Sequence, residues 1–180
     1  MRSAPWVVVL VGVIWCSAYA EAARAEVTAV SENGFVSEHE LDIAADPERV
    51  YQALTGGIHL WWDAAHSYSG KAENFYLEAR ARGCFCEKLS SGGSVRHMQV
   101  VFADPGKQLR LSGGLGPLQT MGVAGSMSFV LVAQPPGTRL EYRYEVGGFT
   151  AGGLAALAGP VDRVQFAQLN RLKAYVEGLP

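Results

Sequence analysis

This sequence has no excess of basic residues. Its 180 residues include 15 Lys and Arg against 17 Asp and Glu, which gives a formal net charge of −2. Proteins that bind nucleic acids need a basic patch that faces the phosphates. The mild acidity therefore argues against a nucleic-acid partner.

Several motifs are missing as well. The glycine-rich stretch SGGLGPLQTMGVAG has no G-x-G-x-x-G between a strand and a helix, which argues against a nucleotide cofactor. We find no serine-nucleophile motif, no obvious pair of catalytic carboxylates, no internal repeat and no low-complexity segment. The sequence thus predicts a domain without a cofactor and offers no simple catalytic signature.

The first 25 residues have the three-part layout of a secretory signal peptide. Arg2 gives a positive start, residues 6–20 are almost wholly apolar, and small-x-small sites follow at 18–20 and 23–25. A membrane span needs about 20 apolar residues, and this run is shorter. We therefore expect a periplasmic or secreted protein without a membrane span after cleavage. Residues 26–180 are then long enough for one domain with a real core.

The mature chain opens with a strand pattern and then a helix pattern. Residues 35–43 alternate, with Ser37 and His39 on the apolar face, and this alternation predicts a strand. The stretch DPERVYQALT predicts a helix with Asp46 as its N-cap and Pro47 at its first position. IHLWWDAAHSYSG then indicates a short second helix or a structured loop.

A run of strands at hairpin spacing follows. Leu140, Tyr142, Tyr144 and Val146 share one face of the stretch RLEYRYEV, and Arg and Glu alternate on the other. This split predicts an antiparallel sheet with one face in water. The other expected strands cover residues 74–79, 83–89, 95–103, 109–112 and 126–133.

The chain closes with a helix that we expect to open at Pro160. Apolar residues recur near helical spacing along it: Val161, Val164, Leu169, Leu172 and Val176. A sheet with an apolar face must cover that face, so this helix must lie across it. The predicted fold is an α+β helix-grip fold, a curved antiparallel sheet wrapped around a long C-terminal helix, with two short helices after the first strand.

These patterns resemble the START/birch-pollen-allergen-like superfamily (SRPBCC), in its chaperone-ATPase-activator-like and polyketide-cyclase-like branch. The matching stretches are LDIAADPERVYQALT, WW, RGCFCEKL, VVFADPGKQLRL, GTRLEYRYEV and VQFAQLNRLKAYVE, and they span residues 36–179. The chain lacks the Rieske-cluster and iron-ligand patterns of the ring hydroxylases in that superfamily. The resemblance implies a cavity between sheet and helix that holds an apolar molecule, but it does not choose among the functions of the superfamily.

The hairpin CFCEKLSSGGSVRHMQV contains the acid–base candidates. With Ser91-Gly92-Gly93 as the turn, Glu87 lies opposite His97, and Phe85 lies opposite Gln99. Relatives direct the aromatic residue of this strand inward, so the resemblance places Phe85 and Glu87 toward the cavity. Glu87 and His97 then form either an acid–base pair or a structural ion pair. A slip of one residue in the register would separate them.

Cys84 and Cys86 then face away from the cavity. Export permits a disulfide, but residues two apart in a strand lie about 6.5–7 Å apart at Cα, at the limit of disulfide reach. Thiolates at this spacing could also bind zinc or copper, but no histidine is placed to complete the site. We expect two free cysteines that pack as small apolar side chains, and we predict no metal site.

Aromatic residues supply the other predicted ligand contacts. The segment HLWWDAAHSY closes one end of the cavity in helix-grip folds, so the resemblance implies that one tryptophan lines the cavity and the other plugs the core. The tyrosines at 142 and 144 face the helix and either reach backbone partners or line the pocket. The predicted ligand-binding residues are Trp61, Trp62, Tyr76, Phe85, Glu87, His97, Gln99, Tyr142 and Tyr144.

Three functions fit these expectations. The first is an exported protein that binds a small, largely apolar molecule between the sheet and the C-terminal helix. The second is an enzyme of the polyketide cyclase or dehydratase type that uses Glu87 and His97 as its acid–base pair. The third is an envelope interaction module whose glycine-rich loops contact another protein. The binder needs a continuous cavity, and the enzyme also needs Glu87 and His97 within hydrogen-bond reach inside it.

Overall fold

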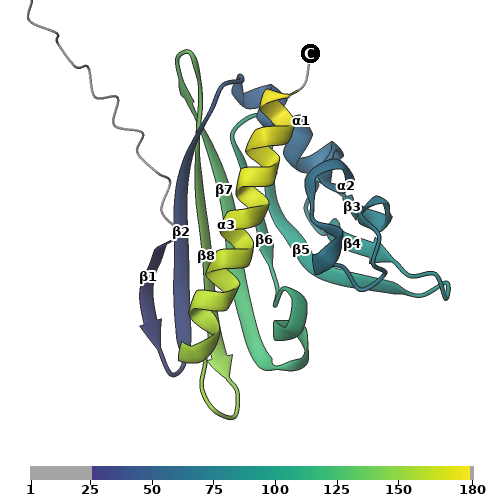
Figure 1. Ribbon diagram of the computed structural model, residues 1–180, viewed down its shortest axis with the longest axis vertical. Coiled ribbons are helices and arrows are strands. Elements are labelled where there is room, and N and C mark those ends of the chain that lie inside the picture. The colour runs from purple at the N-terminus through teal and green to yellow at the C-terminus, as the bar shows by residue number, and fades with distance from the viewer. Residues whose placement is uncertain (1–25, 179–180) are drawn as a thin grey trace, which may run out of the picture.

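The computed structural model describes residues 26–178, and the predicted signal peptide lies outside them. Within this range no helix is long and apolar enough to cross a membrane. The described chain forms a curved antiparallel sheet with one long helix across its inner face (Figure 1). This is the predicted helix-grip arrangement.

The sheet contains eight strands within the described chain, in the spatial order β1-β2-β8-β7-β6-β5-β4-β3. Every neighbouring pair is antiparallel. The strand β1 was not expected from the sequence, and each of the other seven overlaps a predicted strand. The strand β7 begins four residues before its predicted start, inside the glycine-rich stretch. Their bounds are β1 Glu26–Ser31, β2 Gly34–Ile43, β3 Phe75–Leu77, β4 Cys84–Lys88, β5 Ser94–Asp104, β6 Gln108–Ser112, β7 Gly122–Gln134 and β8 Gly137–Phe149.

Two short helices follow β2, as predicted. Helix α1 covers Pro47–Gly56, and the Asp46 side chain caps it by accepting a hydrogen bond from the Arg49 backbone N–H at 3.0 Å. Helix α2 covers Ile58–Trp61. Three single turns of 3₁₀ helix complete the connections: η1 Ala64–His66, η2 Ala72–Asn74 and η3 Gly116–Thr120.

The C-terminal helix α3 covers Ala155–Glu177 and differs from the prediction at its start. It begins five residues before Pro160, so the stretch AALAG, before the expected start of the helix, is also helical. The alanine-rich stretch before Pro160 has high helix propensity, and the proline removes only one backbone hydrogen bond. This early start brings Leu157 and Pro160 beside the cavity described below.

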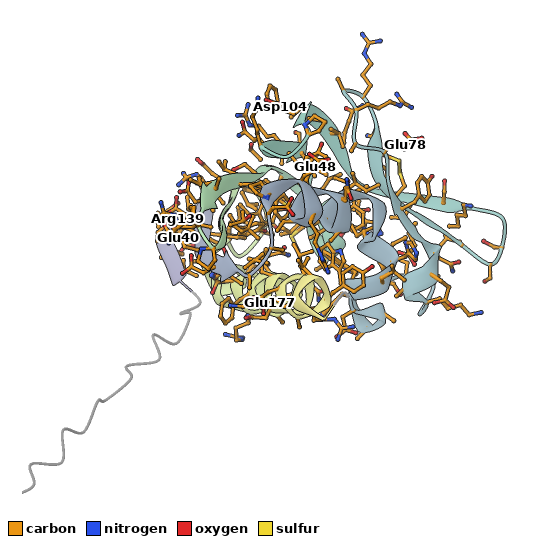
Figure 2. All side chains as sticks on the ribbon, turned by 90° about the horizontal axis from the view of Figure 1, so that it is seen from above. Glu40, Glu48, Glu78, Asp104, Arg139 and Glu177 are labelled. Carbon is orange, nitrogen blue, oxygen red and sulfur yellow. A yellow bond between two sulfur atoms is a disulfide. The ribbon has the colours of Figure 1, made fainter. Side chains whose placement is uncertain are left out.

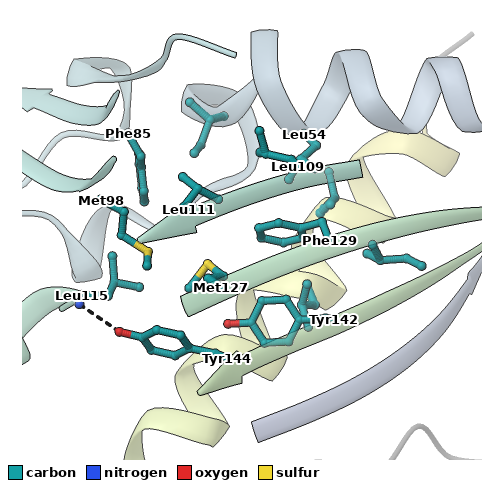
Figure 3. Close-up of a cluster of buried hydrophobic side chains, with 14 of the residues drawn as sticks. Leu54, Phe85, Met98, Leu109, Leu111, Leu115, Met127, Phe129, Tyr142 and Tyr144 are labelled. Carbon is teal, nitrogen blue, oxygen red and sulfur yellow. Dashed lines mark hydrogen bonds between the residues drawn. The ribbon is translucent and has the colours of Figure 1, made fainter. Parts of the chain in front are cut away.

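The core lies between the sheet and α3. The four apolar or aromatic residues of β8 that were expected to face the helix, Leu140, Tyr142, Tyr144 and Val146, are all buried. Leu172 of α3 is also fully buried, and Figure 3 shows part of this cluster, including Phe129 and Tyr142. Charged side chains such as Glu40, Glu78 and Glu177 lie on the outside of the molecule (Figure 2).

Candidate functional site

A cavity of about 470 Å³ opens beside the N-terminal half of α3. Its walls come from four parts of the chain: the segment from the end of α2 through Tyr68, His97 of β5, the loop that carries η3, and α3 itself. Most of the lining is apolar. The lining residues are Trp62, Ala65, His66, Ser67, Tyr68, His97, Leu115, Gly116, Pro117, Leu157, Pro160, Val161, Val164 and Gln165.

Hydrogen bonds from two tyrosines fix the η3 loop beside the cavity. The Tyr68 hydroxyl donates a hydrogen bond to the Gly116 carbonyl at 3.2 Å, which joins the segment after η1 to the η3 loop. The Tyr144 hydroxyl accepts a hydrogen bond from the Leu115 N–H at 3.1 Å and donates to the Gly113 carbonyl at 3.3 Å (Figure 3). The buried Tyr144 side chain thus anchors the start of the η3 loop to the core.

Glu87 and His97 meet behind the cavity wall. His97 Nε2 lies 3.0 Å from Glu87 Oε2, and both side chains are almost completely buried. The same carboxylate accepts hydrogen bonds from the backbone N–H groups of Tyr68, at 3.0 Å, and Ser69, at 2.5 Å. Glu87 therefore ties the segment after η1 to β4, and His97 stands between this carboxylate and the cavity.

The two side chains meet by a different register from the predicted one. Glu87 pairs with Val95, Cys86 with Arg96 and Phe85 with Met98, so the predicted pairings of Glu87 with His97 and of Phe85 with Gln99 are wrong. The turn is the reason: the Leu89 N–H bonds the Gly93 carbonyl at 2.9 Å, so the chain turns one residue earlier than predicted and the partner of Glu87 changes by two residues. A β-bulge between Phe85 and Cys86 then shifts the register again, because two residues of β5 there oppose one step of β4. Both His97 and Met98 are buried as a result, although they are neighbours in the strand.

The surroundings set the protonation of this pair. Burial by itself raises the pKa of Glu87, but the hydrogen bonds from Ser69, Tyr68 and His97 outweigh it and hold that pKa below its ordinary value. Burial lowers the pKa of His97, although the hydrogen bond and charge of Glu87 act in the opposite direction. The result is an ionised carboxylate beside a neutral imidazole. Since a carboxylate only accepts, the imidazole proton is on Nε2, and Nδ1 is left as an acceptor.

The two tyrosines of β8 have partners of different kinds. The Tyr142 hydroxyl donates to Gln165 Oε1 at 2.9 Å, and Gln165 lines the cavity. Tyr142 and Tyr144 themselves lie behind the lining. Burial raises the pKa of Tyr142 well above its ordinary value and that of Tyr144 to about 12, so both hydroxyls stay protonated.

Trp61 and Trp62 have separate environments. Trp62 lines the cavity and packs edge-on against Phe75 and Phe85, with ring centroids 6.0 and 5.1 Å away. Trp61 is buried in the core, and its indole N–H donates to the Ala53 carbonyl at 2.9 Å. This is the expected division of one tryptophan at the cavity and one in the core.

The other predicted ligand contacts fall into two groups. Phe85 and Glu87 are buried behind the lining, and Phe85 packs on the His97 ring at 4.9 Å. Tyr76 and Gln99 are half-buried and are not among the residues that line the cavity. Tyr76 lies opposite Cys86 in the β3–β4 ladder, and the Lys88 ammonium lies over its ring, 5.8 Å from the centroid.

Cys84 and Cys86 form a disulfide, so the expectation of two free thiols is wrong. The strand is irregular here because of the bulge, and the two Cα atoms are 5.4 Å apart rather than the roughly 6.5–7 Å of a regular strand. That distance lies well within the usual disulfide range. Among residues 26–178, no cluster of three His, Cys, Asp or Glu side chains is placed to hold a metal ion.

A second buried polar cluster was missed at the sequence level. The Ser37 hydroxyl donates to Asp162 Oδ1 at 2.6 Å, and His39 Nε2 lies 2.9 Å from the same oxygen. Because the hydroxyl proton points to Asp162 and Ser37 is fully buried, the cluster anchors α3 to β2 and does not present a nucleophile. The sequence did contain a signal for this cluster. Ser37 and His39 are polar residues on an apolar strand face, and Asp162 lies seven residues, or two helical turns, before the buried Leu169 and so on the same face of the helix.

Comparison with known proteins supports the fold and nothing finer. No protein-family model and no curated protein sequence matches the chain. Solved structures do match: an uncharacterised protein from Rhizobium leguminosarum has 17% sequence identity and a TM-score of 0.62, over 80% of this chain and 95% of that one. A protein from Mesorhizobium loti has 20% identity and a TM-score of 0.57, over 81% and 98% of the two chains.

One structural neighbour has a more specific name. CalU16 from Micromonospora echinospora has 16% identity and a TM-score of 0.52, over 82% of this chain and 77% of its own. At such low identities the similarity shows a shared fold alone, and any function has to be argued from the site of this chain.

Proposed function

We propose that this protein binds a small, largely apolar molecule in the cavity that α3 forms with the segment after α2 and the η3 loop, where His97 is the one lining residue from a strand of the sheet. The observation that carries the proposal is the cavity of about 470 Å³ with a mostly apolar lining and a few buried polar groups. Ligand sites have this composition and usually measure roughly 300–1,000 Å³. Burial of about 200 Å² of apolar ligand surface would contribute about 5 kcal/mol before the costs of association.

We also propose membership of the START/SRPBCC superfamily. The order of elements, with two short helices after an early strand and a long helix at the end, supports this assignment. The solved structures that match over most of their length support it at the level of the fold.

Export to the periplasm or the outside is part of the same proposal. The sequence of residues 1–25 has the layout of a signal peptide, and the Cys84–Cys86 disulfide suits an oxidising compartment. Detection of the mature chain in the periplasmic or culture fraction, with an N-terminus near Glu26, is the expected result. A full-length chain in the cytoplasmic fraction would exclude export.

Native mass spectrometry tests the binding proposal. Protein purified gently from its own host should carry an additional small mass. The variant Val164→Trp fills the cavity from α3 and should lose that mass, whereas Ala167→Trp, on the exposed face of the same helix, should retain it. A wild-type protein without added mass, which also fails to bind apolar probes, would refute ligand binding.

Acid–base catalysis is the second candidate function. The observation in its favour is the 3.0 Å contact between Glu87 and His97, with His97 in the cavity wall. A neutral imidazole oriented by a carboxylate can remove a proton from a bound molecule, as a cyclase or dehydratase requires. Glu87→Gln should then lower the turnover of a converted substrate by about 100-fold with little change in its binding. Unchanged turnover would leave the pair a purely structural role.

A further inference from the structure

We infer that the cavity is selective for an uncharged apolar molecule that carries a hydroxyl group, and against carboxylates of the same shape. This inference rests on the proposed binding function and adds the chemical class of the ligand. It follows from the polar atoms of the cavity lining and from the charges around it.

The lining offers no formal charge to an ionic ligand. None of the described residues that line the cavity is Asp, Glu, Lys or Arg. The Glu87 carboxylate sits directly behind His97. A ligand carboxylate placed against His97 would face this negative charge across one imidazole ring.

The first unused polar atom is an acceptor. The Nε2–H of His97 is directed to Glu87, so Nδ1 is the nitrogen left for the cavity, and it forms no hydrogen bond to any residue in the described range. His97 is only 3% exposed, so bulk water reaches it poorly. A ligand hydroxyl can donate to this nitrogen, whereas a carbonyl or a carboxylate cannot.

The other unused atoms are donors. Gln165 lines the cavity and uses Oε1 to accept the Tyr142 proton, which leaves the two N–H groups of its amide for the cavity. The unpartnered indole N–H of Trp62 is buried out of reach of the cavity and is not one of these donors. An unpartnered buried donor costs about 1–3 kcal/mol, so a ligand oxygen that accepts from the Gln165 amide removes a penalty as well as adding a bond.

A hydroxyl group fits both kinds of atom. It can donate to His97 Nδ1 and accept from one of the N–H donors, while the rest of the molecule occupies the apolar part of the cavity. A pure hydrocarbon would leave all these atoms unpaired. A carboxylate would satisfy only the donors and would meet the field of Glu87.

Three probes of nearly equal shape separate these cases: 2-naphthol, naphthalene and 2-naphthoate. Equilibrium dialysis against the ligand-free mature protein at pH 7.5 gives a Kd for each. We expect 2-naphthol to bind about fivefold more tightly than naphthalene, as one net hydrogen bond provides. We expect 2-naphthoate to bind more weakly than naphthalene.

A matched pair of glutamine variants assigns the preference to the cavity. Gln165→Met removes the amide N–H groups that line the cavity, so the preference for 2-naphthol over naphthalene should fall by about twofold or more. Gln168→Met makes the same change at a buried glutamine of α3 that bonds the Asp63 N–H outside the lining, so the preference should stay at its wild-type value.

The outcomes distinguish this inference from the proposed function. If the three probes bind equally, or if 2-naphthoate binds best, the inferred selectivity is wrong while binding of apolar molecules stands. If none of the three binds, both the selectivity and the binding function are refuted. If the two glutamine variants behave alike, the preference does not come from the Gln165 donor and the assignment fails.

Discussion

At the scale of single residues, His97 connects the hydrogen-bonded interior to the cavity. One ring nitrogen contacts Glu87, and the ring packs between Phe75, Phe85 and Tyr68, with centroids 5.2, 4.9 and 5.8 Å away. This environment favours the neutral form because an imidazolium would lose its hydration. Its pKa lies below the ordinary value of 6.5 for that reason, and Glu87 offsets only part of the effect.

The lowered pKa of His97 predicts a loss of stability in mild acid. Below about pH 6.5 the unfolded chain protonates this histidine while the folded chain does not, so the unfolded state binds more protons. The free energy of unfolding should then fall as the pH decreases, by at most about 1.4 kcal/mol per pH unit from this group. His97→Asn removes the titration but keeps a donor for Glu87, and the other three histidines remain. Urea unfolding at several pH values from 7.5 to 5 measures the free energy of unfolding of both proteins.

The test lies in how the stability difference between wild type and His97→Asn changes with pH. We expect the stability difference between wild type and variant to shrink as the pH falls. Parallel stability curves would show that His97 binds its proton equally well in the folded and unfolded chains.

At the scale of elements, the bulge between β4 and β5 determines which side chains of β5 face inward. It lets His97 and Met98 both face inward, and on β4 the disulfide joins Cys84 and Cys86, whose Cα atoms are 5.4 Å apart. The crosslink and the bulge occur at the same point of the two strands. We therefore expect the disulfide to help hold His97 against Glu87.

Replacing both cysteines by serine tests this coupling. Loss of a crosslink that closes so short a loop should lower the free energy of unfolding by about 1–2 kcal/mol. The His97 ring signals in NMR spectra should shift, and the Ser69 amide, which donates to Glu87, should exchange faster with solvent. Spectra with unchanged His97 and Ser69 signals would show that the bulge keeps its form without the disulfide.

The elements also differ in how well the sequence predicted them. The strands β2 and β8 and the helix α1 follow from alternation and capping, which act between residues near in sequence. The start of α3 was misplaced because helix propensity before Pro160 outweighs the proline signal. The register of β4 against β5 was misplaced because the chain turns one residue earlier than predicted, and the bulge beyond the turn leaves no local pattern.

At the scale of the whole molecule, the sheet and α3 share one core. Leu140 of β8 and Leu172 of α3 are both fully buried, and the Ser37, His39 and Asp162 cluster joins the first half of α3 to β2. The cavity lies beside this anchored part of the helix. The helix therefore has one face fixed to the sheet, while Val161 and Val164 are free to face the cavity.

The sequence by itself determined the fold class, because the two-residue and helical periods of its apolar residues record which face of each element is buried. It also brought forward Glu87, His97 and Trp62, which stand out as polar or aromatic residues on inward strand faces or after a helix. Only the tertiary structure decided the cysteine pairing, the anchoring of Asp162 and which atoms of His97 and Gln165 are left for the cavity. These depend on contacts between elements far apart in the chain, where a shift of one residue exchanges the inner face for the outer one.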